Sequence, residues 1–282
     1  MSTGTEAGTP SGAVASRLRR PLANLRLWLA ALVRPPRRLR PRRLRALGMR
    51  FALGTLLALA AIAATMLLVD GPASAATRRL PYPLIDAFNE FTDFGRSGWF
   101  LIPLAVLIGL SAMVSSPALG RIGQLVLASL VVRLGYVFLA IALPGLVVTV
   151  AKRLIGRVRP SELGHFAFFP WSWQPSYASL PSGHATTAFA AAMAIALLWP
   201  RARIPIFVFA IGIALSRVVI SAHYPSDVLA GAFVGCFAAV LVRDWFAARN
   251  LGFVVGPQGQ VTALPGPSLR RVKSVAGRVF GQ

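Results

Sequence analysis

Three cations in this chain have the side-chain chemistry and surroundings that bind an anion. Lys152, Arg159 and Arg217 lie at the ends of long apolar runs. Together they can surround a tetrahedral anion with charge-assisted hydrogen bonds, each worth about 1.5–3 kcal/mol. Ser182 and Gly183 precede a predicted helix, whose free backbone N–H groups favour phosphate, and the glycine permits close approach. The anion that this set predicts is a phosphate.

Two histidines accompany the cations. His223 precedes Asp227 by four residues, and the turn between them lets the carboxylate, at the start of a helix, reach back to the imidazole. A carboxylate there fixes the histidine tautomer, which makes His223 a candidate nucleophile. His184 is then available as the general acid that protonates the departing oxygen. The sequence offers neither an acidic cluster for Mg²⁺ nor a His/Cys set for zinc, so we expect no metal and no other cofactor.

These residues resemble the three signature motifs of the type 2 phosphatidic acid phosphatase family, which shares its active site with vanadium-dependent haloperoxidases. The motifs are Lys152 with Arg159-Pro160, then Pro181-Ser182-Gly183-His184, then Ser216-Arg217 with His223 and Asp227. The resemblance covers about residues 50–245. It implies that Lys152, Arg159, Ser182, Gly183 and Arg217 bind phosphate. It also implies that His184 is the acid, that His223 forms a phosphohistidine, and that Asp227 is its partner.

The elements that must position these residues are predicted to be membrane spans. The chain is 56% hydrophobic, and the apolar residues form runs long enough to cross a bilayer. The runs cover residues 51–69, 99–114, 122–150, 184–199, 204–220 and 228–242. We therefore expect an all-α polytopic protein, a bundle of about six transmembrane helices with its active site at one membrane face. The single cysteine, Cys236, excludes a disulfide framework.

The distribution of charge predicts the orientation. The chain carries 30 Lys and Arg against 8 acidic residues, and twelve arginines lie between Arg17 and Arg50. Because basic segments stay on the cytoplasmic side, both termini are expected there. Loops 70–97, 151–182 and 221–227 then meet on the periplasmic face, in what we expect to be a bacterial inner membrane. Since retention of basic segments already explains the charge, no nucleic-acid partner is expected.

The predicted organisation has three parts. Residues 1–48 form a basic, partly disordered cytoplasmic region with an interfacial helix near 22–33, residues 49–245 form the phosphatase domain, and residues 246–282 form a basic tail. Arg133, inside the third run, is expected to extend toward the inner interface. Gly231 and Gly235 have a spacing that permits close helix packing.

Three features of the loop 151–182 also have an interpretation that involves no chemistry. Taken alone, the cluster Lys152, Arg153, Arg157 and Arg159 could simply bind lipid headgroups at the interface. His165 is expected to be a loop residue. The aromatic residues between 166 and 177 are expected to anchor the loop at the membrane interface.

The function that these features predict is a metal-independent membrane phosphohydrolase acting on a lipid phosphate or diphosphate. Undecaprenyl diphosphate, phosphatidic acid, phosphatidylglycerol phosphate and a lipid A phosphate all present a phosphoryl group to the same cations. Two alternatives stay open. A haloperoxidase-like enzyme would hold vanadate in the same pocket, although those relatives are soluble. A lipid-phosphate carrier would bind without hydrolysis, although nucleophile, acid and orienting carboxylate are all present.

Overall fold

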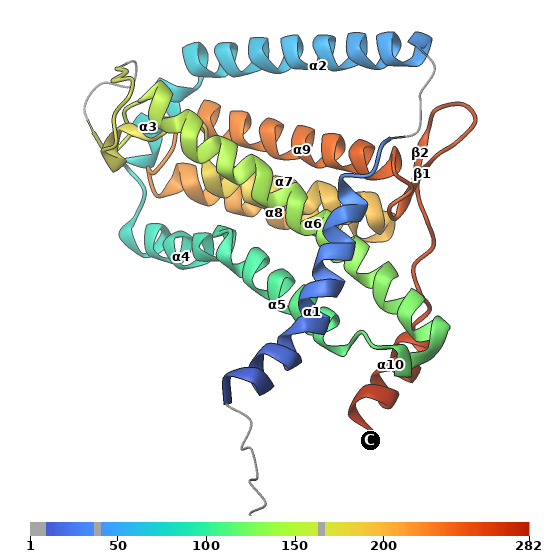
Figure 1. The fold of residues 1–282 in the computed structure, drawn as a ribbon. Coiled ribbons are helices and arrows are strands. Elements are labelled where there is room, and N and C mark those ends of the chain that lie inside the picture. Colours follow the sequence, from blue (N-terminus) through green and yellow to red (C-terminus); the bar gives the residue numbers. More distant parts are fainter. Residues whose placement is uncertain (1–9, 37–40, 163–166, 282) are drawn as a thin grey trace, which may run out of the picture.

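The computed structural model describes residues 10–36, 41–162 and 167–281, and nearly all of its regular structure is helical (Figure 1). The helices are α1 Pro10–Leu32, α2 Pro41–Leu68, α3 Asp70–Thr77, α4 Tyr82–Thr92, α5 Gly98–Val114, α6 Gly120–Ile155, α7 Gly183–Leu198, α8 Arg203–Val219, α9 Pro225–Ala247 and α10 Leu269–Phe280. One antiparallel hairpin joins β1 Phe253–Val255 to β2 Val261–Ala263. His165 lies outside the described residues.

The predicted multispan all-α fold class is confirmed. Within the described residues, five stretches are long and apolar enough to cross a bilayer: Phe51–Leu68, Tyr82–Val114, Pro117–Ile155, Pro200–Val219 and Pro225–Ala247. The sixth predicted span is α7, an apolar helix of 16 residues. None of the apolar stretch of α2 is buried within the protein. In a membrane that helix therefore faces lipid over most of its surface.

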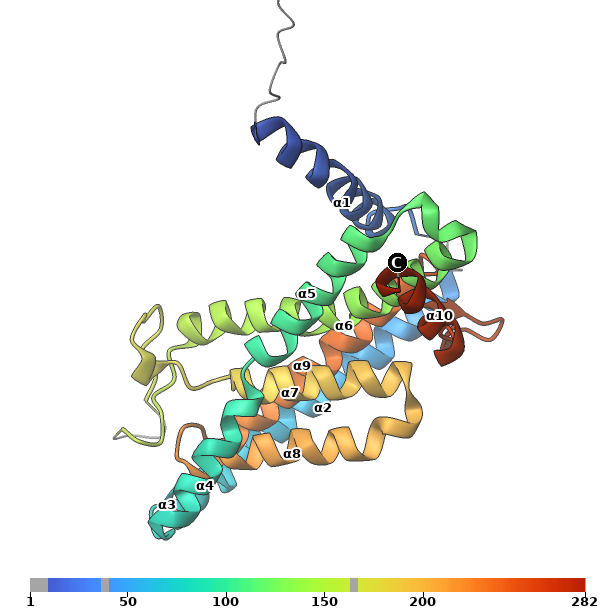
Figure 2. The same ribbon diagram turned by 90° about the horizontal axis from the view of Figure 1, so that it is seen from below.

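The shortest span, α7, lies at the centre of the bundle, between α6 and α8, and packs along α9 (Figure 2). Its inward faces carry small side chains, such as the fully buried Ala190 and Ala194. Opposite them, Gly231 and Gly235 of α9 leave no room for a side chain. A Cβ at either position would lie 2.4 Å from a carbonyl oxygen, that of Ser182 or that of Thr186. The predicted packing role of the two glycines is confirmed.

A second group of contacts ties the last turns of α9 and the segment after it to the middle of α6. The ring of Tyr136 packs against Phe246 and Phe253, and its hydroxyl donates to the carbonyl of Ala239 at 3.1 Å. Arg133 differs from expectation. Its guanidinium does not extend toward the interface but is buried, and it donates to the carbonyl of Leu264 at 2.7 Å. The chain beyond β2 is the reason, because it covers this side of α6.

The segment 70–97 also differs from the expected polar connection, since it contains two helices, α3 and α4. Pro83 lies in the first turn of α4, where a proline costs no hydrogen bond, so it does not prevent helix formation. On the apolar side of α4, Phe91 packs against Phe209 of α8, with ring centroids 6.1 Å apart. The acidic residues of this segment conceal that apolar pattern in the sequence.

The predicted N-terminal helix is longer than expected. It begins at Pro10, ahead of the start expected near residue 22, and it runs crosswise to the bundle (Figure 1). Asn24 donates to the carbonyls of Ala112 and Ser115 at 2.9 and 3.0 Å, and the indole of Trp245 donates to Leu32 at 3.0 Å. These bonds hold α1 against the ends of α5 and α9, a position suited to a membrane interface.

Gly235→Ala tests the close contact of α7 with α9. The added methyl would lie 2.4 Å from the Thr186 carbonyl oxygen and 2.8 Å from the Ala190 nitrogen, and backbone atoms cannot rotate away. Overpacking of this kind costs about 1–3 kcal/mol, so we expect a lower thermal unfolding temperature in detergent.

The matched control is Gly54→Ala in α2, where no atom lies within 4 Å of the added methyl. That change should leave the unfolding temperature unchanged or raise it, because alanine is favoured over glycine in a helix by about 0.5–1 kcal/mol. Equal effects of the two substitutions would contradict the packing described above.

Candidate active site

Segments far apart in the sequence meet at the end of the bundle where α3 lies (Figure 1). The backbone N–H of Ser182 donates to the carbonyl of Asp227 at 2.9 Å, which joins the start of α7 to the start of α9. The hydroxyls of Thr77 and Ser221 are 3.2 Å apart, and Arg78 donates to the carbonyl of Pro160 at 3.3 Å. The three loops that were predicted to share one face are therefore in contact.

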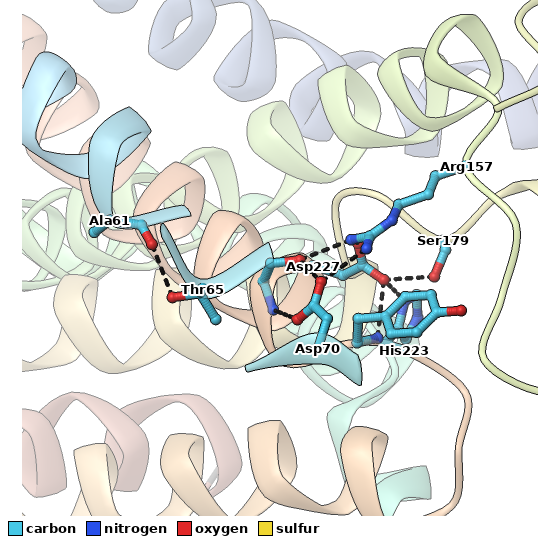
Figure 3. A network of polar contacts seen from close by, with 9 residues as sticks. Ala61, Thr65, Asp70, Arg157, Ser179, His223 and Asp227 are labelled. Atoms are coloured by element: carbon cyan, nitrogen blue, oxygen red, sulfur yellow. Dashed lines mark hydrogen bonds and ion pairs between the residues drawn. The ribbon is translucent and has the colours of Figure 1, made fainter. Parts of the chain in front are cut away.

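His223 and Asp227 form a buried pair at the start of α9 (Figure 3). The Nδ1 atom of His223 lies 3.8 Å from the nearer carboxylate oxygen of Asp227, longer than a hydrogen bond but close enough for strong electrostatic interaction. The carboxylate is held by the backbone N–H of Tyr224 at 2.9 Å and by the hydroxyl of Ser179 at 2.5 Å. With Nδ1 facing the carboxylate, Nε2 lies on the opposite edge of the ring.

The protonation state of His223 follows from its burial. Burial lowers the pKa of His223 below its usual value, and the positive charges of Arg217 and Arg159 act in the same direction. The Asp227 carboxylate opposes this effect and raises the pKa. The net result is a neutral imidazole at pH 7, the state in which a ring nitrogen has a free lone pair.

The three predicted cations come from three elements. Lys152 lies in the last turn of α6 rather than in the loop, and Arg217 lies in the last turn of α8, where it donates to the Thr92 hydroxyl at 3.1 Å. Arg159 is positioned by its backbone N–H, which donates to the carbonyl of Ser176 at 2.9 Å. Burial lowers the pKa of Arg159, and the negative charge of Asp227 opposes that shift.

Several buried polar atoms of this group have no hydrogen-bond partner among the described residues. They are Nε of Arg159, Nε of Arg217 and Oγ of Ser182, whereas Nδ1 of His223, also without a hydrogen bond, faces the Asp227 carboxylate. Buried polar groups in proteins are nearly always paired, and the two guanidinium nitrogens can only donate. Such a set suits an anion that accepts several hydrogen bonds at once.

His184 is the second residue of α7 and lies within electrostatic reach of Lys152, Arg217 and His223. It lines a cavity of about 430 Å³ together with Lys152 and Gly183. The wall of this cavity continues along α5 and α6 through apolar side chains, among them Leu101, Ile141 and Leu146. The cavity thus joins cations and a histidine to a surface that suits hydrocarbon.

Sequence reasoning missed three residues of this region. Arg157, grouped with the interfacial cations, is fully buried and forms ion pairs with Asp70 at 2.7 Å and with Asp227 at 2.6 Å. Arg96 lines the cavity beside Lys152. The one signal for Asp70 was its place directly after an uncharged run. For Arg157, the signal was its place between Gly156 and Val158 in a loop that must fold over the site.

Known proteins resemble this chain in sequence. Residues 133–251 match the family model described as PAP2 superfamily. The lipid A 1-phosphatase of Rhizobium etli is 36% identical over 203 residues, which are 71% of this chain and 86% of that protein. Phosphatidylglycerophosphatase B of Escherichia coli is 35% identical over 94 residues, 31% of this chain and 35% of that protein.

Among solved structures, the transmembrane PAP2-type phosphatidylglycerolphosphate phosphatase from Bacillus subtilis has a TM-score of 0.49 and 22% identity, covering 69% of this chain and 94% of that one. The family assignment itself rests on the sequence matches. The resemblance seen in the three motifs is confirmed by the Rhizobium relative, whose similarity extends over most of its length. The chain therefore belongs to the PAP2 superfamily and is a membrane lipid phosphatase of that type.

Proposed function

We propose that this protein hydrolyses a phosphate monoester of a membrane lipid, with the 1-phosphate of lipid A as the first candidate, through a phosphohistidine on His223. The observation that carries the proposal is the convergence of three cations and two histidines beside an apolar-walled cavity. The choice of lipid is supported by the 36% identity to the Rhizobium lipid A 1-phosphatase, of which this chain covers 86%. Phosphatidylglycerol phosphate is the next candidate, on a match covering 31% of the chain.

In the first chemical step, Nε2 of His223 attacks phosphorus and a P–N bond forms. The bond from phosphorus to the lipid oxygen breaks, and its electron pair goes to that oxygen, which takes a proton from His184. The charge of the bound phosphate favours the protonated form of His184, since an opposite charge nearby stabilises an imidazolium. Asp227 keeps the proton of His223 on Nδ1, so that the lone pair lies on Nε2.

In the second step, water attacks phosphorus and gives a proton to His184, which now acts as the base. The P–N bond breaks, its electron pair returns to Nε2 of His223, and inorganic phosphate leaves. Lys152, Arg159 and Arg217 stabilise the charge on the phosphoryl oxygens in both steps, with Ser182 and the N–H of Gly183 adding hydrogen bonds.

We further propose that the reaction needs no metal ion. In the described part of the chain, no three His, Cys, Asp or Glu side chains gather into a metal-binding group. The positive charge that many phosphatases take from metal ions can be supplied by the three cations.

The orientation is supported by the basic elements at the other end of the bundle. α10 carries the exposed Arg270, Arg271 and Lys273 and packs near the start of α6, whereas Lys152 lies near the end of α6. If the basic end is cytoplasmic, the candidate site is periplasmic and both termini are cytoplasmic.

His223→Gln should lower phosphate release by at least about a thousandfold, because no other group can take over as nucleophile. The purified variant is assayed with lipid A, and its thermal unfolding temperature and its binding of inorganic phosphate provide the controls for folding. In wild-type enzyme, rapid quenching with labelled substrate should trap label on protein that is stable to alkali and lost in acid, as expected of a P–N bond. Undiminished turnover by the variant would exclude the mechanism.

A panel of phosphorylated lipids tests the proposed substrate and the absence of a metal. We expect the highest kcat/KM with lipid A carrying the 1-phosphate, and equal rates with and without EDTA. Undecaprenyl diphosphate, phosphatidic acid and phosphatidylglycerol phosphate complete the panel. A higher kcat/KM for one of these lipids would reassign the substrate. Loss of activity in EDTA, restored by a divalent cation, would refute the metal-independent mechanism, and binding without hydrolysis of any lipid would favour a carrier.

The dependence of kcat/KM on pH should report His223. Because burial lowers the pKa of His223, the neutral nucleophile persists below pH 6.5, and the acid limb should lie there. Since Asp227 raises this pKa, Asp227→Asn should move the limb to still lower pH and reduce kcat by about 10²–10⁴-fold. Because the wild-type enzyme and the Asp227→Asn variant are compared on one substrate, the ionisation of the substrate affects both profiles equally. An acid limb at the same pH in both enzymes would show that it reports a group other than His223.

A further inference from the structure

We propose that Asp70 and Arg157 are positioning residues, which fix the orientation of Asp227 and the negative charge that it presents to His223. The inference rests on the proposed role of His223 as nucleophile. Neither residue belongs to the set that surrounds the phosphate. Both lie behind Asp227, on α3 and on the loop after α6 (Figure 3).

Arg157 bridges the two carboxylates. Its Nη2 donates to Asp70 at 2.7 Å and its Nη1 donates to Asp227 at 2.6 Å, and all three side chains are fully buried. The guanidinium carbon also lies 4.3 Å from the ring centroid of Tyr224, the residue that follows His223. The guanidinium stacks on that ring and binds two carboxylates that lie in different directions. These contacts together fix the orientation of its plane.

Asp70 also holds the start of α9. Its Oδ1 accepts the backbone N–H of Ser226 at 2.9 Å, and the Ser226 hydroxyl, which accepts from Arg157 at 2.7 Å, contacts its other oxygen. A carboxylate that accepts the N–H groups of a first turn stabilises a helix terminus. Asp70 therefore fixes the turn in which Asp227 lies, as well as the arginine that binds Asp227.

The charges of this group explain why a second carboxylate is needed. One guanidinium lies between two carboxylates, so the buried group has a net charge of about −1 in simple formal terms. Without Asp70, the positive charge of Arg157 would be balanced by Asp227 alone, and the field of that carboxylate at His223 would be largely cancelled. With Asp70 present, Arg157 is shared, and Asp227 keeps negative charge toward the imidazole.

A purely structural role would not require these charges. Burying an arginine between two carboxylates carries a desolvation cost, and well-packed apolar residues are often as stable. A cluster that acts electrostatically on the neighbouring His223 does require its charges. The other charged or titratable groups that act on His223 come from different directions: Arg217 from α8, Arg159 from the loop, and His184 from α7. Asp70 and Arg157 act through Asp227.

Asp70→Asn, which removes the charge and keeps the shape, is the principal test. We expect kcat to fall about 10- to 100-fold with little change in KM, the range found for residues that support metal-binding side chains from behind. The acid limb of kcat/KM should move to lower pH. Asp70→Glu, which retains the charge, should keep the limb at its wild-type position. Asp244→Asn removes a carboxylate from the far end of α9, where it pairs with Arg243, and should change neither quantity.

The double variant Asp70→Asn with Arg157→Gln provides a second test, because it removes the buried arginine together with its Asp70 partner. Asp227 then acts on His223 without a cation behind it, so the acid limb should move to higher pH, opposite to the single variant. Limbs that stay at the wild-type pH in both variants, with only the unfolding temperature lowered, would overturn the inference. In that case His223→Gln would still abolish turnover. Undiminished turnover by His223→Gln would instead overturn the proposed function.

Discussion

The first turns of α7 and α9 touch through their backbones, and the positions of both histidines depend on that contact. The N–H of Ser182 donates to the carbonyl of Asp227, and Gly231 brings the backbone of α9 against the carbonyl of Ser182. One helix start carries His184 and the other carries the carboxylate that faces His223. A hydrogen bond between two helix termini thus joins the proposed acid to the proposed nucleophile.

The same end of the bundle contains many charged side chains close to the membrane. A charge buried near hydrocarbon is costly unless it is paired. Charged residues in membrane proteins therefore pair with each other or face a water-filled cavity. Behind the site, Arg157 is paired on two sides by carboxylates. On the other side, Lys152, Arg159 and Arg217 lie within electrostatic reach of one another, with few acidic partners among the described residues. The charges behind the site are thus paired, and the excess of cations on its other side is what the proposed binding of phosphate requires.

Much of the candidate site could be predicted because its residues occur in short motifs. Lys152 with Arg159, the run Ser182 to His184, and Arg217 with His223 and Asp227 each keep fixed local spacing, and local spacing is visible in a single chain. The six apolar runs were visible for the same reason, since a span is defined by continuous hydropathy.

What could not be predicted depends on contacts between distant residues. Asp70 and Arg157 are 87 positions apart, and nothing in either neighbourhood shows that they pair. α4 was missed because acidic residues and prolines hide an apolar side that becomes evident only against α8. Likewise, Arg133 was expected at the interface because the segment that covers it returns from more than a hundred residues away, at Leu264.

The apolar wall that Leu101, Ile141 and Leu146 add to the cavity has a consequence for how this phosphatase meets its substrate. A lipid whose tails stay in hydrocarbon while its head group reaches Lys152 never passes through water. Encounter is then a two-dimensional search within one leaflet. The quantity that determines saturation of the enzyme is accordingly the mole fraction of substrate in the surface. Diluting the substrate lipid with detergent or inert phospholipid is then equivalent to lowering the substrate concentration.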